Sequence, residues 1–351
     1  MNTIIEKDLD EIFSLTRGLW EELRGKRLFI TGGTGFFGAW LLRSFAKANN
    51  TLGLNAQVLA LSRNPDSFKS QFPDLAKNPA ILFHQGDIRD FKFPEGKFGY
   101  VIHMATTTAA ETFNKEDELK KFDTVAFGTR RALEFAALCK AKKFLYTSSA
   151  SLYGKQPPEL THMPETYNGA PDPTDLSGHA ASLGMGKRAA EFFCAYYAKQ
   201  SGMEVKIARG FSFVGPGLPL DIHYAIGNFI RDALNGGPIK ILGDGTARRS
   251  YMYISDLIVW LWVILLKGKS GRAYNVGSEE DISISSLAHL VAENFSGSIQ
   301  VNIAKSPVPG APPDRQVPST ARAQKELGLK QIVGLKEAVI RTIKYHETAK
   351  N

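Results

Sequence analysis

Cysteine is scarce in this chain, and long apolar runs are absent. The 351 residues include two cysteines, Cys139 and Cys194, each in an apolar stretch with helical periodicity. Two isolated thiols are typical of a reducing compartment and provide neither a disulfide framework nor a metal site. The most apolar run, residues 257–266, is far shorter than the roughly 20 residues that a membrane-spanning helix needs. The sequence therefore predicts a cytoplasmic protein with no metal and no membrane association.

No block of basic residues accounts for the net charge of +8. Lysine and arginine are spread along the chain, apart from a small cluster at Lys140, Lys142 and Lys143. Nucleic-acid-binding proteins concentrate basic residues in patches or stripes, and no stripe interleaved with aromatic residues occurs here. We therefore expect no nucleic-acid partner. Some of the basic residues could instead contact the phosphates of a small ligand.

Short apolar segments alternate with segments of helical periodicity through the first 210 residues. Strands are predicted at 26–31, 57–61, 81–83, 100–104, 143–147 and 204–208, and helices at 39–48, 125–141 and 184–199. Strands that are apolar along their whole length belong to a parallel sheet covered by helices on both faces. The fold class is therefore α/β, with a Rossmann doubly wound parallel sheet over residues 26–210. Residues 1–25 precede it as an amphipathic helical extension rather than a signal peptide.

The composition changes after Gly215 and Pro216, where proline and glycine become frequent. Short strands predicted at 239–242, 273–276 and 300–303 are separated by helices at 224–235, 254–266, 284–295 and 335–346. This pattern predicts a smaller mixed α/β lobe over residues 211–351, interleaved with the first and closing over the carboxyl edge of its sheet. Residues 306–318 contain five prolines and are expected to form a loop.

A glycine-rich turn connects the first strand to the first helix. Gly32, Gly35 and Gly38 follow a GxxGxxG spacing, and Phe36 and Phe37 lie between the last two. Glycine allows a sharp turn there and lets the backbone approach a pyrophosphate, whose charge faces the N–H groups of the helix. Because the turn lies at the first strand of a βαβ run, the sequence predicts a dinucleotide cofactor, NADP or NAD.

The ends of the next two strands bear on which dinucleotide is bound. An acidic residue after the second strand would bind the ribose 2′-hydroxyl of NAD, whereas an arginine suits the 2′-phosphate of NADP. Ser62 and Arg63 stand at this position, so NADP is favoured over NAD. Asp87 and Ile88 end the third strand, where Asp87 could accept from the adenine amine and Ile88 could pack on the ring. As alternatives, Arg63 could be a surface residue and Asp87 could belong to a plain turn at the end of the strand.

Several longer stretches occur in the order found in one enzyme family: TGGTGFFG, GDI, VIHMA, LYTSSASLYG, GMGKRAAE and GDGTARRSYMYISD. With them, the chain resembles the extended short-chain dehydrogenases/reductases over residues 26–346, and more narrowly the nucleotide-sugar epimerases and 4,6-dehydratases. The resemblance implies a Rossmann lobe that binds NAD(P), with Ala105 in the cofactor site, and a second lobe that binds a nucleotide-diphosphate sugar. It also implies chemistry that begins with hydride transfer from the sugar to the nicotinamide.

The resemblance assigns catalytic roles to two residues. Ser149, after the fifth strand, matches the serine or threonine that holds the sugar hydroxyl. Lys187 matches the lysine of a Tyr-x-x-x-Lys pair, in which the lysine holds the cofactor ribose and lowers the pKa of the tyrosine that removes the hydroxyl proton. Leu183 stands where the tyrosine belongs, and leucine cannot carry a proton.

Another residue must therefore carry this proton if the sugar is oxidised. His179 precedes Leu183 by one helical turn, so that His179, Leu183 and Lys187 would share a face if the helix begins early. Histidine titrates near neutral pH, and we predict His179 as the base, with a loop or surface position as the alternative. Tyr153 and Tyr167 are further candidates, although Tyr153 is favoured as a packing residue. Otherwise the chain is a catalytically silent homologue that binds its ligands or pairs with an active relative.

Further positions depart from the family pattern. Typical 4,6-dehydratases carry Asp-Glu directly after the serine or threonine, where this chain has Ala150 and Ser151. A standard dehydratase is therefore not expected, whereas an epimerase, a decarboxylase or an atypical dehydratase is consistent with the sequence. Thr124 stands where the fourth helix of the family usually offers asparagine.

The second lobe contains residues that match the nucleotide-sugar site of the family. Asn228 matches the stretch that contacts the nucleotide, and Arg249 matches an arginine that binds the diphosphate. A guanidinium makes paired hydrogen bonds to phosphate oxygens. Arg315, in the proline-rich loop, is a candidate for a second clamp, and both arginines could instead serve surface ion pairs. The resemblance leaves the nucleotide base and the sugar open.

In the family, the helices that correspond to 125–141 and 184–199 form a four-helix dimer interface. Both carry apolar residues on more than one side, namely Phe135, Leu138, Phe192, Phe193, Tyr196 and Tyr197. The resemblance therefore implies a homodimer. It also suggests a role in the synthesis of surface polysaccharides or specialised metabolites.

Overall fold

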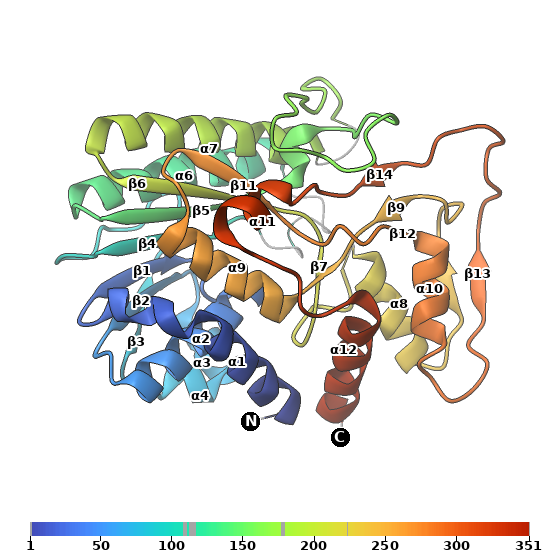
Figure 1. Cartoon of the computed structure of the whole chain (residues 1–351), viewed down its shortest axis with the longest axis horizontal. Coiled ribbons are helices and arrows are strands. Elements are labelled where there is room, and N and C mark those ends of the chain that lie inside the picture. Colours follow the sequence, from blue (N-terminus) through green and yellow to red (C-terminus); the bar gives the residue numbers. More distant parts are fainter. Residues whose placement is uncertain (1, 108–110, 112–116, 177–179, 223, 351) are drawn as a thin grey trace.

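A seven-stranded parallel sheet forms the centre of the computed structural model, which describes residues 2–107, 111, 117–176, 180–222 and 224–350 (Figure 1). In spatial order the strands are β11 (Arg272–Val276), β6 (Glu204–Gly210), β5 (Lys143–Ser149), β4 (Tyr100–His103), β1 (Arg27–Thr31), β2 (Gln57–Ser62) and β3 (Ile81–Gln85). The strand order reverses between β1 and β4, which creates a switch point at the carboxyl edge where doubly wound sheets bind ligands. The predicted Rossmann α/β fold is confirmed.

Helices cover both faces of this sheet. α6 (Glu118–Leu138) and α7 (Ala180–Ser201) pack together on one face, while α2 (Phe36–Leu52) and α9 (Ile254–Lys267) lie on the other (Figure 1). Alternate residues of β1 belong to the two separate cores, with Leu28 and Ile30 in one and Phe29 in the other. Burial on both faces is the reason that β1 is apolar at three consecutive positions.

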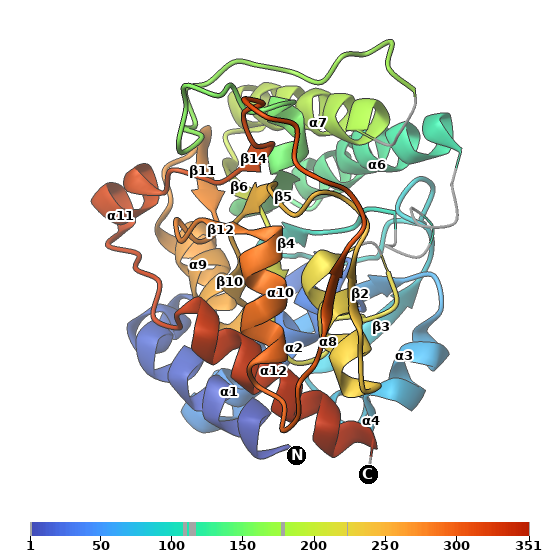
Figure 2. The same ribbon diagram turned by 90° about the vertical axis from the view of Figure 1, so that its right-hand side faces the viewer.

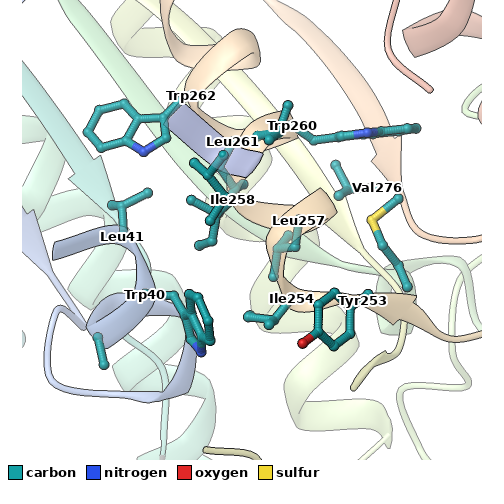
Figure 3. Packing of buried hydrophobic residues seen from close by; sticks show 14 of the residues in the cluster. Trp40, Leu41, Tyr253, Ile254, Leu257, Ile258, Trp260, Leu261, Trp262 and Val276 are labelled. Carbon is teal, nitrogen blue, oxygen red and sulfur yellow. The ribbon is translucent and has the colours of Figure 1, made fainter. Parts of the chain in front are cut away.

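The most apolar run of the sequence forms most of α9 and is enclosed on almost every side. Figure 3 shows Trp262 and Leu261 of this helix near Leu41 of α2, with Ile258 and Leu257 on the same helix. The Trp262 ring lies 4.7 Å from that of Trp20, and its Nε1 donates to Ser44 Oγ at 2.9 Å. A helix that is apolar all round is a core helix when neighbours surround it. No helix in the described part of the chain is long and apolar enough to span a membrane.

The two ends of the chain pack beside each other against α9 and the second lobe (Figure 2). The predicted N-terminal extension is helical, as α1 (Thr3–Thr16) and the 3-10 helix η1 (Arg17–Leu23), and α12 (Leu335–Lys350) ends the chain. Buried Asp8 of α1 accepts a hydrogen bond from Tyr253 Oη at 2.5 Å and one from Arg341 Nη1 of α12 at 2.6 Å. This contact ties the N-terminal helix to the C-terminal helix.

The second lobe is built from short strands and helices. β8 (Ile239–Ile241) pairs with β13 (Val301–Ile303), β7 (Phe213–Val214) with β10 (Met252–Tyr253), and β9 (Arg248–Arg249) with both β12 (Ile282–Ser283) and β14 (Arg315–Gln316). Helices α8 (Ala225–Leu234) and α10 (Ile284–Ala292) pack against each other beside them (Figure 2). The remaining elements, which the sequence did not predict, are α3 (Pro65–Gln71), α4 (Pro73–Ala76), the 3-10 helix η2 (Ala150–Tyr153) and α11 (Ala321–Leu327).

Two expectations about the second lobe differ from the structure. The strand expected there at 273–276 is β11, which extends the main sheet beside β6, with Ala273 opposite Ile207. The sequence pattern did not show this because the pairing joins residues more than 60 positions apart. The proline-rich segment also contains strand β14, since Arg315 and Gln316 pair with β9.

Candidate functional site

A cleft of about 600 Å³ opens at the carboxyl edge of the sheet. Its walls come from the glycine turn, from the ends of β2, β3, β4 and β5, from the first turns of α6 and α7, and from residues 210–224. This volume lies within the range of cofactor and substrate sites. The cleft therefore coincides with the switch point and lies between the main sheet and the start of the second lobe.

The glycine turn forms a cradle at one wall of the cleft. A Cβ atom at Gly38 would lie 2.3 Å from the carbonyl oxygen of Gly32, and one at Gly32 would lie 2.6 Å from the carbonyl carbon of Met104. These two glycines are required by close backbone packing. Gly35 is different, because the nearest atom to its Cβ would be 3.6 Å away and it lines the cleft as the N-cap of α2. The space at Gly35 fits a pyrophosphate at the helix N-terminus.

The residues predicted for the adenosine half of the cofactor line the same cleft, together with Phe36, Phe37 and Ala105. The Arg63 guanidinium donates to both carboxylate oxygens of Glu111, at 2.7 and 3.2 Å. The Asp87 carboxylate accepts from Arg89 at 2.9 and 3.1 Å, and this bonding lowers the pKa of Asp87. Both charged side chains are therefore already engaged by a neighbour.

A polar hollow of about 200 Å³ adjoins the cleft at the end of β2. It shares Thr34, Ser62 and Arg63 with the cleft, and its other lining residues are Asn64, Ser67, Phe68 and Gln71. None of these side chains is acidic. A phosphate group attached to the adenosine ribose would meet one guanidinium and several hydroxyl or amide groups there.

Buried His103, at the end of β4, holds the loop that borders the cleft. Its ring nitrogens lie 2.6 Å from Thr31 Oγ1 and 2.9 Å from Thr129 Oγ1, and burial lowers the pKa of His103 to about 3. Thr31 Oγ1 in turn accepts from the backbone N–H of Ala105 at 3.3 Å. The neutral imidazole therefore positions the loop after β4 and takes no part in proton transfer near pH 7. Its position as the single polar residue of an apolar strand was the sequence signal for this role.

Ser149, Leu183 and Lys187 line one cleft. Ser149 Oγ accepts from the backbone N–H of Ser151 at 3.2 Å. Lys187 Nζ donates to the carbonyl oxygen of Thr147 at 2.8 Å and lies 4.8 Å from the centre of the Tyr146 ring. Burial lowers the pKa of Lys187 to about 8. A buried lysine therefore lines the cleft, with an apolar side chain one helical turn before it.

The candidate replacements for the missing tyrosine differ in their positions. His179 lies outside the described residues. Tyr153 is buried away from the cleft, where its hydroxyl donates to Asn275 Oδ1 at 2.7 Å and accepts from Arg209 Nη1 at 2.8 Å. Tyr167 packs near it, with ring centres 6.3 Å apart, and does not line the cleft either. Neither tyrosine is therefore placed to replace the proton carrier.

Of the four residues predicted for the nucleotide sugar, Ser149 lines the cleft, whereas Asn228, Arg249 and Arg315 lie outside it. Arg249 pairs with Asp314 at 2.6 Å, Arg315 pairs with Asp281, and Asn228 accepts from Arg231 at 3.3 Å. The structure brings Arg249 and Arg315 to one small sheet, on β9 and β14. A diphosphate would have to displace Asp314 or Asp281 to bind there. The cleft wall instead comes from apolar and aromatic residues that the sequence had not singled out: Phe211, Phe213, Pro219, Ile222 and Tyr224.

Comparison with known proteins places this geometry in a family. A model of the NAD dependent epimerase/dehydratase family matches residues 28–277, which include all but the first residue of the main sheet and every described residue of the cleft wall. The chain belongs to this family. Membership confirms the expected nicotinamide dinucleotide, NAD or NADP, as its cofactor. When bound, that cofactor would supply a hydride acceptor.

Relatives and solved structures agree with this membership. UDP-glucuronic acid decarboxylase 1 of Arabidopsis thaliana is 28% identical over 318 residues, which cover 90% of this chain and 69% of that protein. The decarboxylase 1 of Xenopus tropicalis is 27% identical over 342 residues, 97% of this chain and 76% of that protein. An epimerase of Methanothermobacter thermautotrophicus superposes with a TM-score of 0.78 at 24% identity, covering 96% and 97% of the two chains. UDP-glucuronic acid 4-epimerase of Bacillus cereus, solved with NAD, superposes with a TM-score of 0.76 at 22% identity, covering 93% and 100%.

Proposed function

We propose that this chain binds a nucleotide-diphosphate sugar beside NAD(P) and modifies the sugar as an epimerase, a decarboxylase or an atypical dehydratase. One observation carries the proposal: a single cleft is lined by the glycine cradle, by Ser149 and Lys187, and by residues 210–224. The names of the relatives support a sugar nucleotide as substrate, since they include UDP-glucuronic acid decarboxylases and a dTDP-glucose 4,6-dehydratase.

The residues after Ser149 argue against the usual dehydration. A carboxylic acid would be needed to protonate a leaving hydroxyl, and Ala150 and Ser151 provide none. The Ser151 hydroxyl is buried and has no hydrogen-bond partner among the described residues. An epimerase or a decarboxylase, which keeps every hydroxyl in place, fits these side chains better.

For the cofactor we propose NADP. The polar hollow at the end of β2 has room for a 2′-phosphate, and Arg63 lies at its boundary with the cleft. The carboxylate of Glu111, which comes from a different segment, is occupied by Arg63 itself. No acid stands at the end of β2 to select the 2′-hydroxyl of NAD.

A homodimer through α6 and α7 is also proposed. The side of this helix pair that faces away from the sheet exposes large apolar side chains, among them Phe127, Leu138, Phe192 and Tyr196, at 49–69% of their full surface. Large apolar side chains exposed together on two packed helices are typical of a protein interface.

Leu183 supports a second candidate function, that of a binding protein without catalysis. Calorimetry with UDP-glucuronate, UDP-glucose and dTDP-glucose in the presence of NADP tests the binding site common to both candidates. The absorbance of the reduced cofactor in the same mixtures then separates them. We expect tight binding of at least one nucleotide sugar and transient reduction of the cofactor. Absence of binding across the panel would refute the proposed function, and binding without any reduction would favour the silent homologue.

A further inference from the structure

One carboxylate from a distant segment lies against the basic wall of the cleft. Both carboxylate oxygens of Glu111 accept hydrogen bonds from the guanidinium of Arg63, at 2.7 and 3.2 Å. Lys120 Nζ lies 3.6 Å from the same carboxylate. Glu111 and Arg63 are 48 positions apart in the sequence, and both line the cleft together with Lys120. The guanidinium that the sequence assigns to a 2′-phosphate is therefore already bound by a carboxylate of the same chain.

The pairing of Arg63 with Glu111 has the geometry of a phosphate contact. A guanidinium binds a carboxylate or a phosphate through the same two parallel N–H groups, so that one anion excludes the other. The side chain of Glu111 is 24% exposed and that of Arg63 is 50% exposed. Solvent therefore reaches the pair and weakens it, as in other partly exposed ion pairs. A phosphate that binds Arg63 can displace Glu111 at a moderate cost in free energy.

The charges of this wall show how Glu111 opposes a phosphate. The cations are Arg63, Arg89 and Lys120, and the carboxylates are those of Glu111 and Asp87. Asp87 is held by Arg89 at 2.9 Å. With three cations and two carboxylates the wall has a net charge of +1, and it would have +2 without the Glu111 carboxylate. A phosphate monoester carries between one and two negative charges near neutral pH, since its second pKa is about 6. Glu111 therefore halves the positive charge that a 2′-phosphate would meet.

The acidic residues at the start of α6 do not compete for Arg63. Asp117 is the N-cap of this helix, and its Oδ1 accepts from the backbone N–H of Lys120 at 2.9 Å. Neither Asp117 nor Glu118 lines the cleft. The hollow beside Arg63 is lined by no acidic side chain either. Among the described residues, Glu111 is therefore the carboxylate that competes with a phosphate for this guanidinium.

Lys120 offers the Glu111 carboxylate a second partner. Lys120 lies in the first turn of α6, where the positive end of the helix dipole disfavours a cation. A carboxylate close to its ammonium offsets this effect, and Glu111 Oε1 lies 3.6 Å from Lys120 Nζ. A Glu111 side chain displaced from Arg63 would keep Lys120 as its counterion. The displacement therefore leaves no charge of this group unpaired.

We propose that Glu111 sets the preference between the two nicotinamide dinucleotides, because it competes with the 2′-phosphate of NADP for Arg63. The inference rests on the NADP assignment within the proposed function. With NAD, a 2′-hydroxyl carries no charge for the guanidinium, and the pair of Arg63 with Glu111 stays intact. With NADP, Arg63 donates the same N–H groups to the phosphate and Glu111 pairs with Lys120 instead. Glu111 is thus a specificity-determining residue that weakens the binding of NADP and not that of NAD.

Calorimetry on the full chain tests this competition independently of catalysis. Glu111→Gln keeps the size of the side chain and removes its charge. The affinity for NADP is expected to rise about fivefold, the equivalent of about 1 kcal/mol, which is the upper range for a partly exposed ion pair. The affinity for NAD should change by less than about twofold, because the pair is not disturbed by NAD. Glu111→Ala should give the same result, since the gain comes from removing the carboxylate and not from the new amide.

Two controls separate this local competition from a general effect of charge. Asp66→Asn removes one negative charge from α3, between two residues that line the hollow, at a side chain that is 88% exposed and paired with Lys69. It should change the ratio of the NADP and NAD affinities by less than about twofold, because water and salt screen an exposed charge. In an Arg63→Ser protein, Glu111→Gln should raise the NADP affinity by less than about twofold, because the group for which Glu111 competes is gone.

The outcomes that overturn the proposal are distinct from those that overturn the proposed function. If Glu111→Gln leaves the NADP affinity unchanged, or if Asp66→Asn raises it as much, the proposal is wrong. If Glu111→Gln weakens NAD and does not strengthen NADP, Glu111 binds the ribose and the proposal is wrong as well. A gain that persists in full with Arg63→Ser shows that Glu111 does not act through Arg63, which also overturns it. A chain that binds both dinucleotides and no nucleotide sugar refutes the proposed function, while the ratio of the two dinucleotide affinities still decides this inference.

Discussion

The glycine cradle allows a sharp test, because Gly35 and Gly38 are glycines for different reasons. Gly38→Ala would place a Cβ 2.3–2.4 Å from three backbone atoms of Gly32 and Gly33. Backbone atoms cannot rotate away, so the turn must shift, and overpacking of this kind costs about 3 kcal/mol. Alanine within a helix recovers about 1 kcal/mol relative to glycine. The net loss in the free energy of unfolding is therefore about 2 kcal/mol.

Gly35→Ala is the matched comparison. The backbone of Gly35 has a φ of −87°, which alanine adopts readily, and the nearest atom to the new Cβ would be 3.6 Å away. Alanine is a poorer N-cap than glycine, so we expect the free energy of unfolding to fall by about 0.5 kcal/mol, well below the loss for Gly38→Ala. The methyl group would nevertheless occupy the space for the pyrophosphate, and NADP affinity should fall by about tenfold or more, which corresponds to about 1.4 kcal/mol.

Urea denaturation without cofactor and calorimetry with NADP measure the two effects separately. The reasoning predicts lost stability for Gly38→Ala and lost affinity with only a small loss of stability for Gly35→Ala. A Gly35→Ala protein that binds NADP as tightly as the parent would show that the diphosphate lies elsewhere. A Gly38→Ala protein as stable as the parent would show that the strand-to-helix turn is less tightly packed than the structure indicates.

Three further predictions concern the cofactor, the assembly and pH. Arg63→Ser should weaken the affinity for NADP about tenfold, as measured by calorimetry, and change the affinity for NAD by less than about twofold. Equal losses of affinity for the two cofactors would exclude a contact between Arg63 and the 2′-phosphate. Phe192→Glu should convert the homodimer to a monomer, as measured by light scattering. Leu242→Glu is the control, at a residue that is 81% exposed in the other lobe, and should leave the dimer intact. A monomeric parent protein would contradict the proposed interface. Burial raises the pKa of Asp8 from 3.8 to about 6, so the stability that its protonated form contributes is present below about pH 4 and is lost as the pH rises through 6. Relative to the parent, the free energy of unfolding of Asp8→Asn should therefore rise by up to about 3 kcal/mol over this pH range, as measured by urea denaturation. A difference between the two proteins that does not change with pH would refute the raised pKa of Asp8.

The main sheet and the cofactor turn were predictable because their signals are local. β1 is buried on both faces, so its consecutive residues Leu28, Phe29 and Ile30 are all apolar and mark it as a strand. The glycine spacing needs no knowledge of distant segments, since the contacts that require Gly38 are with Gly32 and Gly33. The replacement of the expected tyrosine by Leu183 was also visible locally, because Leu183 lies four residues before Lys187.

Contacts between distant segments were not predictable from these patterns. Residues 272–276 carry the composition of the second lobe and still complete the main sheet beside β6, because parallel pairing depends on a partner that the sequence does not identify. The pairing of Arg63 with Glu111 and the pairing of Arg249 with Asp314 bridge 48 and 65 residues. Whether an arginine is free to bind a phosphate depends on these carboxylate partners, and a sequence motif does not identify them.

The sequence by itself determined an α/β protein with a Rossmann sheet, a nicotinamide dinucleotide and a lysine without its tyrosine. Each of these depends on residue type and spacing within a few turns of the chain. The tertiary structure alone decided the electrostatic state of that lysine. Glu191 lies one helical turn from Lys187 and could have been its counterion, but Arg209 of β6 holds it instead. Burial then brings the pKa of Lys187 to about 8, because desolvation disfavours the charged form more than the charge of Glu191 favours it, and desolvation depends on every segment packed around the lysine.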